Sequence, residues 1–390
     1  MRILQMPNRE EAYAFLDELR LLPPANAPEQ VKGRIVLYGA GNLGKLAFGC
    51  LKHIGIRPEY VLDRNAQPGL TLEGDLPVHT PLAVVAEEDI TVLVTTVNTA
   101  FTPIHNQLAS LGFKNIMPFY DYAQLFKDKH PINNGWFSGV LNAEDIAGIR
   151  LTLEELDDPW SRAAYLQMLA WRMVRDDWIF EDADVSPDDR YFIEPVVRAL
   201  TEEEHFVDVG AYDGRVFLKF LGIVNGKYAS AYLIEPDSYN IKMLDSALSG
   251  LPSEVLPKVN VEQVALSANG GLLPFSHGFD MASRLVDIQA IKTRAVKLDD
   301  MPIQPSFVKM HIEGGEYDAL VGGLKMLANY RPILATTIYH NRDGLWKIPQ
   351  LLMQALDNYK FYFRLHGWCG TGAVLYGLPN ERILSNHTYL

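Results

Sequence analysis

Asp208-Val209-Gly210-Ala211-Tyr212-Asp213-Gly214 is a glycine turn at the end of a short apolar stretch that begins at Phe206. The first strand of an open α/β sheet ends at the ligand crevice, and glycines there let the backbone approach a bound molecule. About 20 residues after the turn, Glu235 ends the next apolar stretch and is followed by Pro236. An acid at that position can accept hydrogen bonds from both hydroxyls of a ribose. The pair therefore predicts a ligand that carries a nucleoside.

The charge of the turn narrows the choice of ligand. Asp208 and Asp213 add negative charge, which would repel a pyrophosphate but suits the sulfonium and ammonium groups of S-adenosylmethionine. Either feature alone could be a polar turn or a solvated strand end. Together, at this spacing, they favour S-adenosylmethionine over a dinucleotide.

Alternating strand and helix patterns around this turn predict a mainly parallel sheet. The expected strands are Phe206–Gly210, Ala231–Glu235, Val259–Leu266, Phe307–Glu313 and Ile333–Tyr339, and the stretches Phe361–Leu365 and Ala373–Tyr376 are expected to form a closing hairpin at the sheet edge. The chain is thus predicted to be an α/β protein.

Several ordered motifs over roughly residues 190 to 378 resemble the FkbM-type methyltransferases. The motifs are Asp208–Gly214, Ile234–Asp237, Val264–Ser267, Leu298–Asp300, Val308–Glu316, Tyr339–His340 and Leu345–Pro349. The resemblance implies the class I methyltransferase fold, a Rossmann-like sheet of seven strands whose last strand runs antiparallel. It also implies methyl transfer from S-adenosylmethionine, usually to a hydroxyl of a sugar-containing or natural-product acceptor.

The same resemblance assigns the residues that hold the methyl donor. It implies that Asp208, Gly210 and Glu235 contact S-adenosylmethionine and that Ser267 lies near the adenine. We include Tyr212, Gly214 and Pro236 in the predicted cofactor site because they belong to the same two motifs.

The predicted acceptor side departs from the family pattern at one position. His311 stands where the family usually has an aspartate between the lysine and the glutamate of its Lys-x-x-x-Glu-Gly segment. A histidine can act as a general base, because its ordinary pKa of about 6.5 lies near working pH. The alternative is a core residue in an enzyme whose activity is altered or lost. Lys309 lies on the other face of the strand and is expected to pair with an acid or extend to solvent.

Two further residues are expected beside His311. Glu313 ends the fourth strand and His340 follows the fifth on the same side of the sheet, so the predicted catalytic residues are His311, Glu313 and His340. Three such side chains without known geometry are a weak signal for a divalent metal, and we assign no metal ligand from the sequence. Glu316 is expected to cap the following helix or to interact with its dipole.

A second glycine motif lies in the first half of the chain. Gly39-Ala-Gly41-Asn-Leu-Gly44 follows the apolar strand Ile35–Tyr38 and precedes a helix, and Asp63 ends the next strand. This is the dinucleotide fingerprint in its usual context. The region is short for a full dinucleotide domain, so we predict a small Rossmann-like domain that holds a nucleotide, a nucleotide-sugar or NAD. The alternative is that the glycines only allow tight packing of strand and helix.

The length of 390 residues predicts two or three globular domains. The expected divisions are an N-terminal helix and linker (1–30), the small Rossmann-like domain (31–125), a helical connector (126–190) and the methyltransferase domain (191–390). Helices between residues 144 and 180 are the expected interface of a homodimer.

Composition limits the partners and the compartment. A net charge of −13 disfavours nucleic acid, whose binding usually depends on phosphate neutralisation. Two cysteines cannot build a disulfide framework, and this favours a reducing cytoplasm. Acidic residues near Met1 argue against a signal peptide, and we find no uncharged apolar run of roughly 18 residues that would span a membrane.

The sequence thus predicts an S-adenosylmethionine-dependent O-methyltransferase that acts on a small-molecule or glycan acceptor. An NAD(P)-dependent oxidoreductase that uses the first glycine motif, and a non-catalytic ligand-binding protein, stay open as alternatives. The acceptor pocket is expected in two variable loops, Ser276–Arg284 and Gly367–Gly372.

Overall fold

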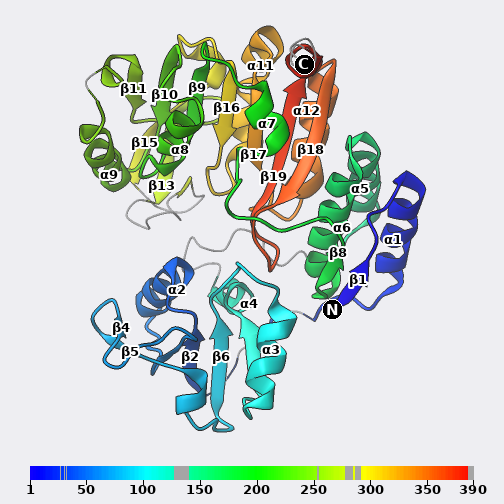
Figure 1. Cartoon of the computed structure of the whole chain (residues 1–390), viewed down its shortest axis with the longest axis vertical. Helices are drawn as coiled ribbons and strands as arrows, with labels where there is room; N and C mark the ends of the chain where they lie inside the picture. Colours follow the sequence, from blue (N-terminus) through cyan, green and yellow to red (C-terminus); the bar gives the residue numbers. More distant parts are fainter. Residues whose placement is uncertain are drawn as a thin grey trace. The chain divides into compact units, whose positions relative to one another are not determined.

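The chain forms two compact units in the computed structural model (Figure 1). The structure describes residues 1–26, 28–29, 31, 33–126, 140–252, 254–276, 284–285 and 291–384. Unit 1 comprises Met1–Leu141, Ala163–Pro187 and Leu365–Gly372, and unit 2 comprises Asn142–Arg162, Asp188–Arg364 and Ala373–Leu390. The predicted helical connector is therefore divided between the units, and its residues 127–139 lie outside the described residues.

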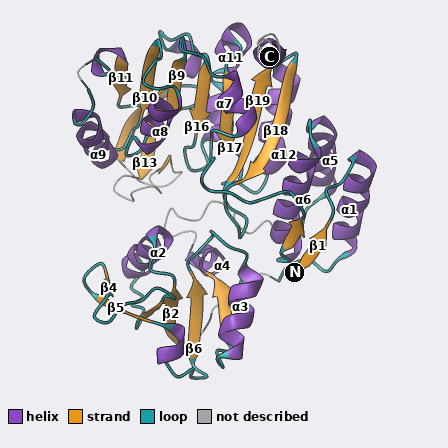
Figure 2. Ribbon diagram, in the orientation of Figure 1, coloured by secondary structure: helices purple, strands orange, loops and turns teal. Residues whose placement is uncertain are grey.

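Unit 2 is built on a seven-stranded sheet with the order β11-β10-β9-β16-β17-β19-β18 (Figure 2). Its strands are β9 (His205–Val209), β10 (Ser230–Ile234), β11 (Val259–Glu262), β16 (Phe307–Met310), β17 (Ile333–Thr337), β18 (Tyr359–Leu365) and β19 (Ala373–Pro379). The first five pair in parallel, whereas β19 runs antiparallel to β17. This confirms the predicted fold class and the antiparallel last strand.

The structure confirms one detail of the predicted strands and corrects another. The closing hairpin is confirmed, with β19 inserted beside β17 and β18 at the edge. The single strand predicted over Val259–Leu266 is wrong, because β11 ends at Glu262 and β12 (Ala265–Leu266) joins a separate four-stranded sheet. Glu262 is paired with Ile234, the last residue of β10, so the chain has no neighbour to pair with beyond that point.

Helices connect the parallel strands and pack on the sheet. They are α7 (Glu194–Ala199), α8 (Arg215–Ile223), α9 (Ser238–Ser249), α10 (Glu316–Val321), α11 (Leu324–Tyr330) and α12 (Gly344–Ala355), with α13 (Asn380–Leu384) after the last strand. An aromatic core joins β9, β16 and α8: the Phe206 ring stacks on Phe220 at 4.4 Å, and Phe307 lies 5.1 Å from Phe206. This packing fixes β9 beside β16, whose carboxyl ends carry the predicted site.

Helix α5 (Ala143–Glu155) also belongs to unit 2 and packs on α12. The Trp346 indole donates to Asp145 over 3.1 Å, and a Cβ at Gly148 would lie 2.4 Å from the Trp346 ring. Only glycine allows the two helices to approach this closely at that point.

The four-stranded sheet has the order β12-β15-β13-β14. Its other strands are β13 (Gly271–Ser276), β14 (Arg284–Leu285) and β15 (Ile291–Val296). Almost all of the acceptor loop predicted at Ser276–Arg284 lies outside the described residues.

Unit 1 contains a six-stranded sheet with the order β4-β5-β3-β2-β6-β7. The strands are β2 (Arg34–Tyr38), β3 (Val61–Leu62), β4 (Thr71–Leu72), β5 (Leu76–His79), β6 (Ile90–Val94) and β7 (Asn115–Pro118), and the helices are α2 (Asn42–His53), α3 (Phe101–Ser110) and α4 (Phe119–Ala123). All its pairings are parallel except that of β4 with β5. The smaller Rossmann-like sheet predicted for the first half is confirmed.

Unit 1 also includes β1 (Arg2–Leu4), which pairs in parallel with β8 (Trp178–Phe180), and α1 (Arg9–Leu21). Asn8 caps α1 with a reciprocal capping box that involves Glu11, which explains why the helix begins at Arg9. Helix α6 (Pro159–Val174) begins in unit 2 and continues in unit 1. In the described part of the chain, no helix has the length and apolar character needed to cross a membrane.

Candidate active site

The turn after β9 is packed directly against the segment that follows β16. Gly210 has a φ of 77°, and a Cβ there would lie 1.9 Å from the carbonyl oxygen of His311. The His311 amide donates to the Val209 carbonyl over 2.9 Å. Only glycine fits at position 210. The turn Asp208–Gly214, which we call the donor turn because it is predicted to hold the methyl donor, is therefore adjacent to His311, the first residue predicted to face the methyl acceptor.

A buried ion pair lies beneath this turn. Lys309 Nζ donates to Asp208 Oδ1 over 2.7 Å and to the Gly210 carbonyl over 2.8 Å. Both side chains are almost fully buried, and the predicted pairing of Lys309 with an acid is confirmed. Burial raises the pKa of Asp208, and the Lys309 charge opposes that rise. Asp208 Oδ2 is buried and accepts no hydrogen bond from the described residues.

Glu235 joins the end of β10 to the same turn. Its carboxylate accepts hydrogen bonds from the Tyr212 amide and the Asp237 amide, both over 3.0 Å, and from Asn240 Nδ2 over 3.2 Å. Tyr212 adopts a left-handed φ of 50°, which points its amide toward β10. Burial raises the pKa of Glu235 despite these donors. The turn and Glu235 thus lie together, as their spacing predicts.

The other residues predicted to hold the methyl donor lie in two different places. Gly214 is the N-cap of α8 with a φ of 81°, and Pro236 is buried beside Glu235. Ser267 follows β12 of the four-stranded sheet, where its amide donates to Val296 and its hydroxyl accepts from the Gly270 amide over 3.1 Å. These contacts do not connect Ser267 to the turn, so its place near the adenine stays a prediction.

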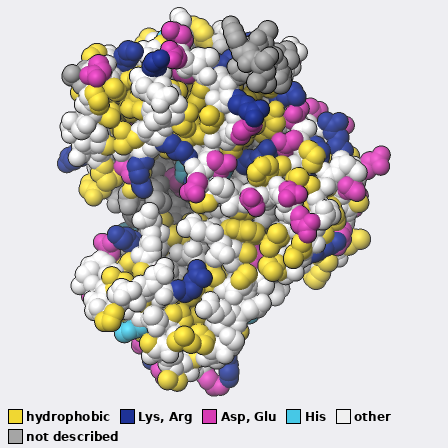
Figure 3. Space-filling model, in the orientation of Figure 1, with side chains coloured by type: hydrophobic (Ala, Val, Ile, Leu, Met, Phe, Trp, Pro, Cys, Tyr) yellow, Lys and Arg dark blue, Asp and Glu magenta, His cyan; other side chains and the backbone are white. Residues whose placement is uncertain are grey.

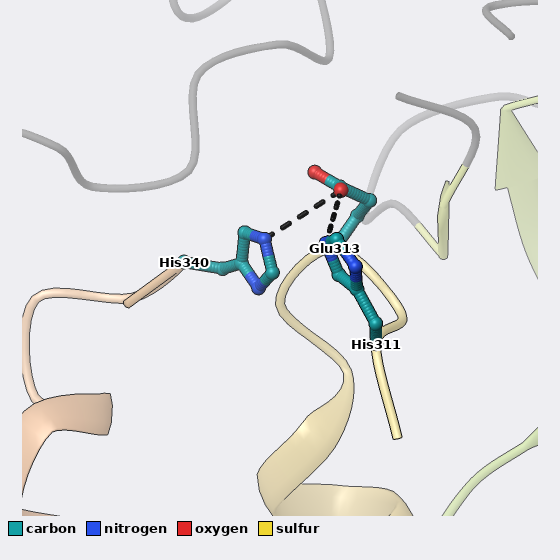
Figure 4. Close-up of side chains that lie close together, drawn as sticks. All are labelled: His311, Glu313 and His340. Atoms are coloured by element: carbon teal, nitrogen blue, oxygen red, sulfur yellow. Dashed lines mark ion pairs between the residues drawn. The ribbon is translucent and has the colours of Figure 1, made fainter. Parts of the chain in front are cut away.

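The three predicted catalytic side chains form one cluster (Figure 4). Glu313 Oε1 lies 2.9 Å from His311 Nε2 and 3.5 Å from His340 Nε2. The two imidazole rings stack with centroids 5.0 Å apart. The His311 and Glu313 side chains are 22% and 16% exposed, and that of His340 is 1% exposed. The cluster is therefore accessible from the side of His311 and Glu313.

A second group of side chains holds the histidines in place. The Tyr191 hydroxyl lies 2.7 Å from His311 Nδ1, and Glu316 Oε1 lies 2.8 Å from His340 Nδ1. Glu316 also accepts from Thr337 Oγ1 over 2.8 Å. The amides of Ile312 and Gly314 donate to the same carboxylate over 3.1 and 2.9 Å. Each imidazole thus has its Nδ1 engaged and its Nε2 directed at Glu313.

Two residues of the site have roles that the sequence motifs did not predict, Tyr191 and Glu316. Tyr191 lies before α7, outside every motif, and only the fold brings it to His311. Glu316 starts α10 as predicted, but its carboxylate reaches back to the loop amides and to His340 instead of serving the helix alone. Its pairing with a histidine 24 positions away has no local signal in the sequence.

Burial and neighbouring charges set the protonation of the cluster. Burial lowers the pKa of His311 to about 4, so its imidazole is neutral at neutral pH. Burial would raise the pKa of Glu313, but the His340 charge and the closeness of both imidazoles outweigh it and the pKa falls. Burial would lower the pKa of His340, but Glu316 and Glu313 raise it well above its ordinary value.

The glycine motif of unit 1 has the geometry of a tight turn. Gly39 has a φ of 114°, and a Cβ at Gly44 would lie 2.1 Å from the Gly39 carbonyl oxygen. A Cβ at Gly41 would meet no atom within 4 Å. Asp63 accepts from the Ala40 amide and from a second amide, both over 2.8 Å, and thereby closes the turn itself. Tight packing explains Gly39 and Gly44, and a nucleotide at Gly41 and Asp63 stays a prediction.

Comparison with known families decides the identity of unit 2. Residues 208–363 match the Methyltransferase FkbM domain. The chain contains an FkbM methyltransferase domain. The predicted resemblance is confirmed, and the family is one of S-adenosylmethionine-dependent methyltransferases.

The FkbM domain match includes Asp208, Glu235 and the His311–Glu313–His340 cluster, whereas Tyr191 and unit 1 lie outside it. The crystal structure of the methyltransferase FkbM from Methylobacillus flagellatus is 19% identical, with a TM-score of 0.64, and the match covers 94% of this chain and 98% of that one. It shows a shared fold that includes both units.

A precorrin-6y C5,15-methyltransferase from Geobacter metallireducens is 12% identical, with a TM-score of 0.29 over 47% of this chain and 85% of that one. No curated protein matches the chain.

Proposed function

We propose that the FkbM domain transfers a methyl group from S-adenosylmethionine to a hydroxyl of a small-molecule or glycan acceptor. One observation supports this proposal above the others: a cluster of imidazole and carboxylate groups lies immediately beside the predicted donor turn. Transfer to a hydroxyl requires alignment of the two substrates and removal of the hydroxyl proton. The two neighbouring sites divide these tasks.

The residues of the turn suit the donor chemically. In the proposal, Glu235 accepts hydrogen bonds from the ribose, and Asp208 provides negative charge for the cationic end of the donor. The unpartnered Oδ2 of Asp208 is a buried acceptor at this place that a ligand donor could satisfy. When bound, S-adenosylmethionine supplies a methyl carbon whose bond to sulfur breaks as its bond to the acceptor oxygen forms, leaving a neutral thioether.

The cluster suits the acceptor. His311 and Glu313 form its partly exposed side, although the His311 Nε2 atom itself is buried, and in the proposal the acceptor hydroxyl reaches the cluster from this side. His340 is buried and held by Glu316, so in the proposal it keeps the Glu313 carboxylate in position. In the proposal, the hydroxyl proton passes to the neutral imidazole of His311 as the oxygen attacks.

Calorimetric titration with the demethylated donor, S-adenosylhomocysteine, tests the donor half of the proposal. We expect binding at one site per chain and its loss in Asp208→Ala and Glu235→Ala, whereas the exposed control Glu203→Gln binds as the unaltered protein does. No binding heat, or equal binding in all variants, would contradict it.

The acceptor half is tested by transfer of isotopically labelled methyl from S-adenosylmethionine to a panel of sugars and phenols. We expect label on oxygen, located by mass spectrometry and NMR. Label found only on nitrogen or carbon would refute O-methylation while leaving the methyltransferase itself in place. Reduction or oxidation of NAD(P) with the same compounds would favour the oxidoreductase alternative.

The predictions on partners and location remain as the sequence made them. On the face drawn in Figure 3, basic side chains lie among acidic and apolar ones. The absence of a nucleic-acid partner stays a prediction. The cytoplasmic location and the homodimer remain predictions.

A further inference from the structure

We infer that His311, Glu313 and His340 form a binding site for one divalent transition-metal ion. Each residue offers one ligand atom, and these three atoms all lie within 4.8 Å of one another. Figure 4 shows both imidazoles directed at the same carboxylate oxygen. They come from two loops, after β16 and after β17, at neighbouring positions of the sheet.

The hydrogen bonds around the cluster are those of a metal site. A ligating histidine almost always donates its other ring N–H to a carboxylate or another acceptor, which fixes the tautomer and the ring orientation. His340 Nδ1 is engaged by Glu316 and His311 Nδ1 by the Tyr191 hydroxyl, at 2.8 and 2.7 Å. Both Nε2 atoms are thereby left facing Glu313. Two histidines that only stabilised the fold would not need this common arrangement.

The backbone holds the carboxylate in place at a cost. Glu313 has a left-handed φ of 53°, a conformation that costs free energy for a residue with a side chain and that clusters at functional sites. The next residue is Gly314, whose amide donates to Glu316 and whose carbonyl accepts from Asn341 Nδ2 over 2.7 Å. The loop is thus fixed on both sides of the ligand it presents.

The donor set selects the class of ion. Two imidazole nitrogens and one carboxylate oxygen suit Zn²⁺, Fe²⁺, Co²⁺ or Ni²⁺, whereas Mg²⁺ and Ca²⁺ prefer oxygen ligands. Three protein ligands leave at least one coordination position for water or a substrate oxygen. Of the three ligands, the His311 and Glu313 side chains are the partly exposed ones, so a substrate oxygen would reach the ion from their side.

The role of the ion rests on the proposed function, although the site itself does not. A hydroxyl bound to the ion would have a lowered pKa, as metal-bound water does. Its O–H bond then breaks, the proton leaves to solvent, and the oxygen keeps the electron pair with which it attacks. With the ion bound, His311 and Glu313 are its ligands and no longer take the proton, and the ion would assist the deprotonation in their place.

Metal content and spectroscopy test the inference without measuring activity. Tag-free protein is stripped with a chelator, reloaded with Zn²⁺ and analysed by calorimetry and elemental analysis, and Co²⁺ is titrated while its visible absorption is recorded. We expect one ion per chain and the intense absorption of a low-symmetry Co²⁺ site. His311→Ala and Glu313→Gln should lose both signals, whereas the exposed control His205→Ala keeps them.

Tyr191→Phe provides a graded variant, since it removes only the hydroxyl that holds His311 Nδ1. Loss of such an outer partner weakens metal affinity by about 10 to 100-fold, and we expect a loss in this range. Circular dichroism confirms that each variant is folded, and His340→Asn is included in case a variant of the accessible ligands is unstable.

Less than 0.1 ion per chain in the reloaded protein, or equal affinity in the control and the ligand variants, would overturn the site. Titration of S-adenosylhomocysteine into the same samples separates the two proposals. If the cofactor product binds and the metal does not, the metal site is wrong and the methyltransferase proposal stands. If only the metal binds, the reverse holds.

Discussion

Lys309→Met tests the buried ion pair beneath the donor turn. The Lys309 and Asp208 side chains are 2% and 0% exposed, and their charged atoms are 2.7 Å apart. Removing the cation leaves Asp208 buried without its counter-charge and removes the donor to the Gly210 carbonyl. Breaking a buried pair in this way costs about 3–5 kcal/mol, because one uncompensated charge remains in the interior. We expect this loss in the free energy of unfolding of unit 2.

Urea titration followed by hydrogen exchange of peptides from β9 and β16 measures this loss specifically in unit 2. Asp208→Asn should cost a similar amount, because it leaves Lys309 as the unpaired charge. The double variant should cost clearly less than the sum of the two, since it leaves no charge behind. A cost below about 1 kcal/mol for Lys309→Met, or strict additivity, would refute the argument that the pair is electrostatically coupled; values this small are typical of exposed pairs.

Three further predictions follow from other residues of the structure. Gly210→Ala should lower the free energy of unfolding of unit 2. A left-handed backbone alone costs about 1–2 kcal/mol for a residue with a side chain, and we expect a larger loss because the new Cβ would also overlap the His311 carbonyl. An unchanged urea unfolding curve would contradict this. Because burial raises the pKa of Glu235 and the ribose needs the ionised form, affinity for S-adenosylhomocysteine should fall on acidification at a higher pH than an exposed glutamate would give. Glu235→Gln should have weaker affinity with a flatter pH profile, and a profile that does not change would argue against Glu235 as the ligand. Burial raises the pKa of the Cys50 thiol to about 12, so iodoacetamide at pH 8 should modify it only after unfolding; rapid labelling of the native protein, read by mass spectrometry, would contradict its burial.

The apolar pattern of single stretches of sequence predicted the helices and strands that depend on neighbouring residues alone. The strands β9, β10, β16 and β17 and a helix near the N-terminus have clear apolar patterns, and the sequence predicted each of them. The break between β11 and β12 was not, because it depends on where the neighbouring strand β10 ends. Such a break is a property of pairing between strands, which a single stretch of sequence does not encode.

The candidate site shows the same division. His311, Glu313 and His340 could be expected at one sheet edge because parallel strands end together. That their ring nitrogens meet on one oxygen could not be predicted, because it depends on the left-handed backbone of Glu313 and on hydrogen bonds from Tyr191 and Glu316. These partners are distant in sequence, and only tertiary structure brings them to the site.

The division of the chain between the two units has a consequence for synthesis on the ribosome. Unit 1 takes its last segment from Leu365–Gly372, and unit 2 is completed by β19, which inserts beside β17 rather than at the sheet edge. Domains usually fold during translation from the N-terminal end. Here unit 1 is incomplete until Gly372 has emerged and the sheet of unit 2 until Pro379 has emerged, so a nascent chain would expose the open edge of β17 from the synthesis of Thr337 until β19 is available. A chaperone that covers such edges would be needed most at that stage.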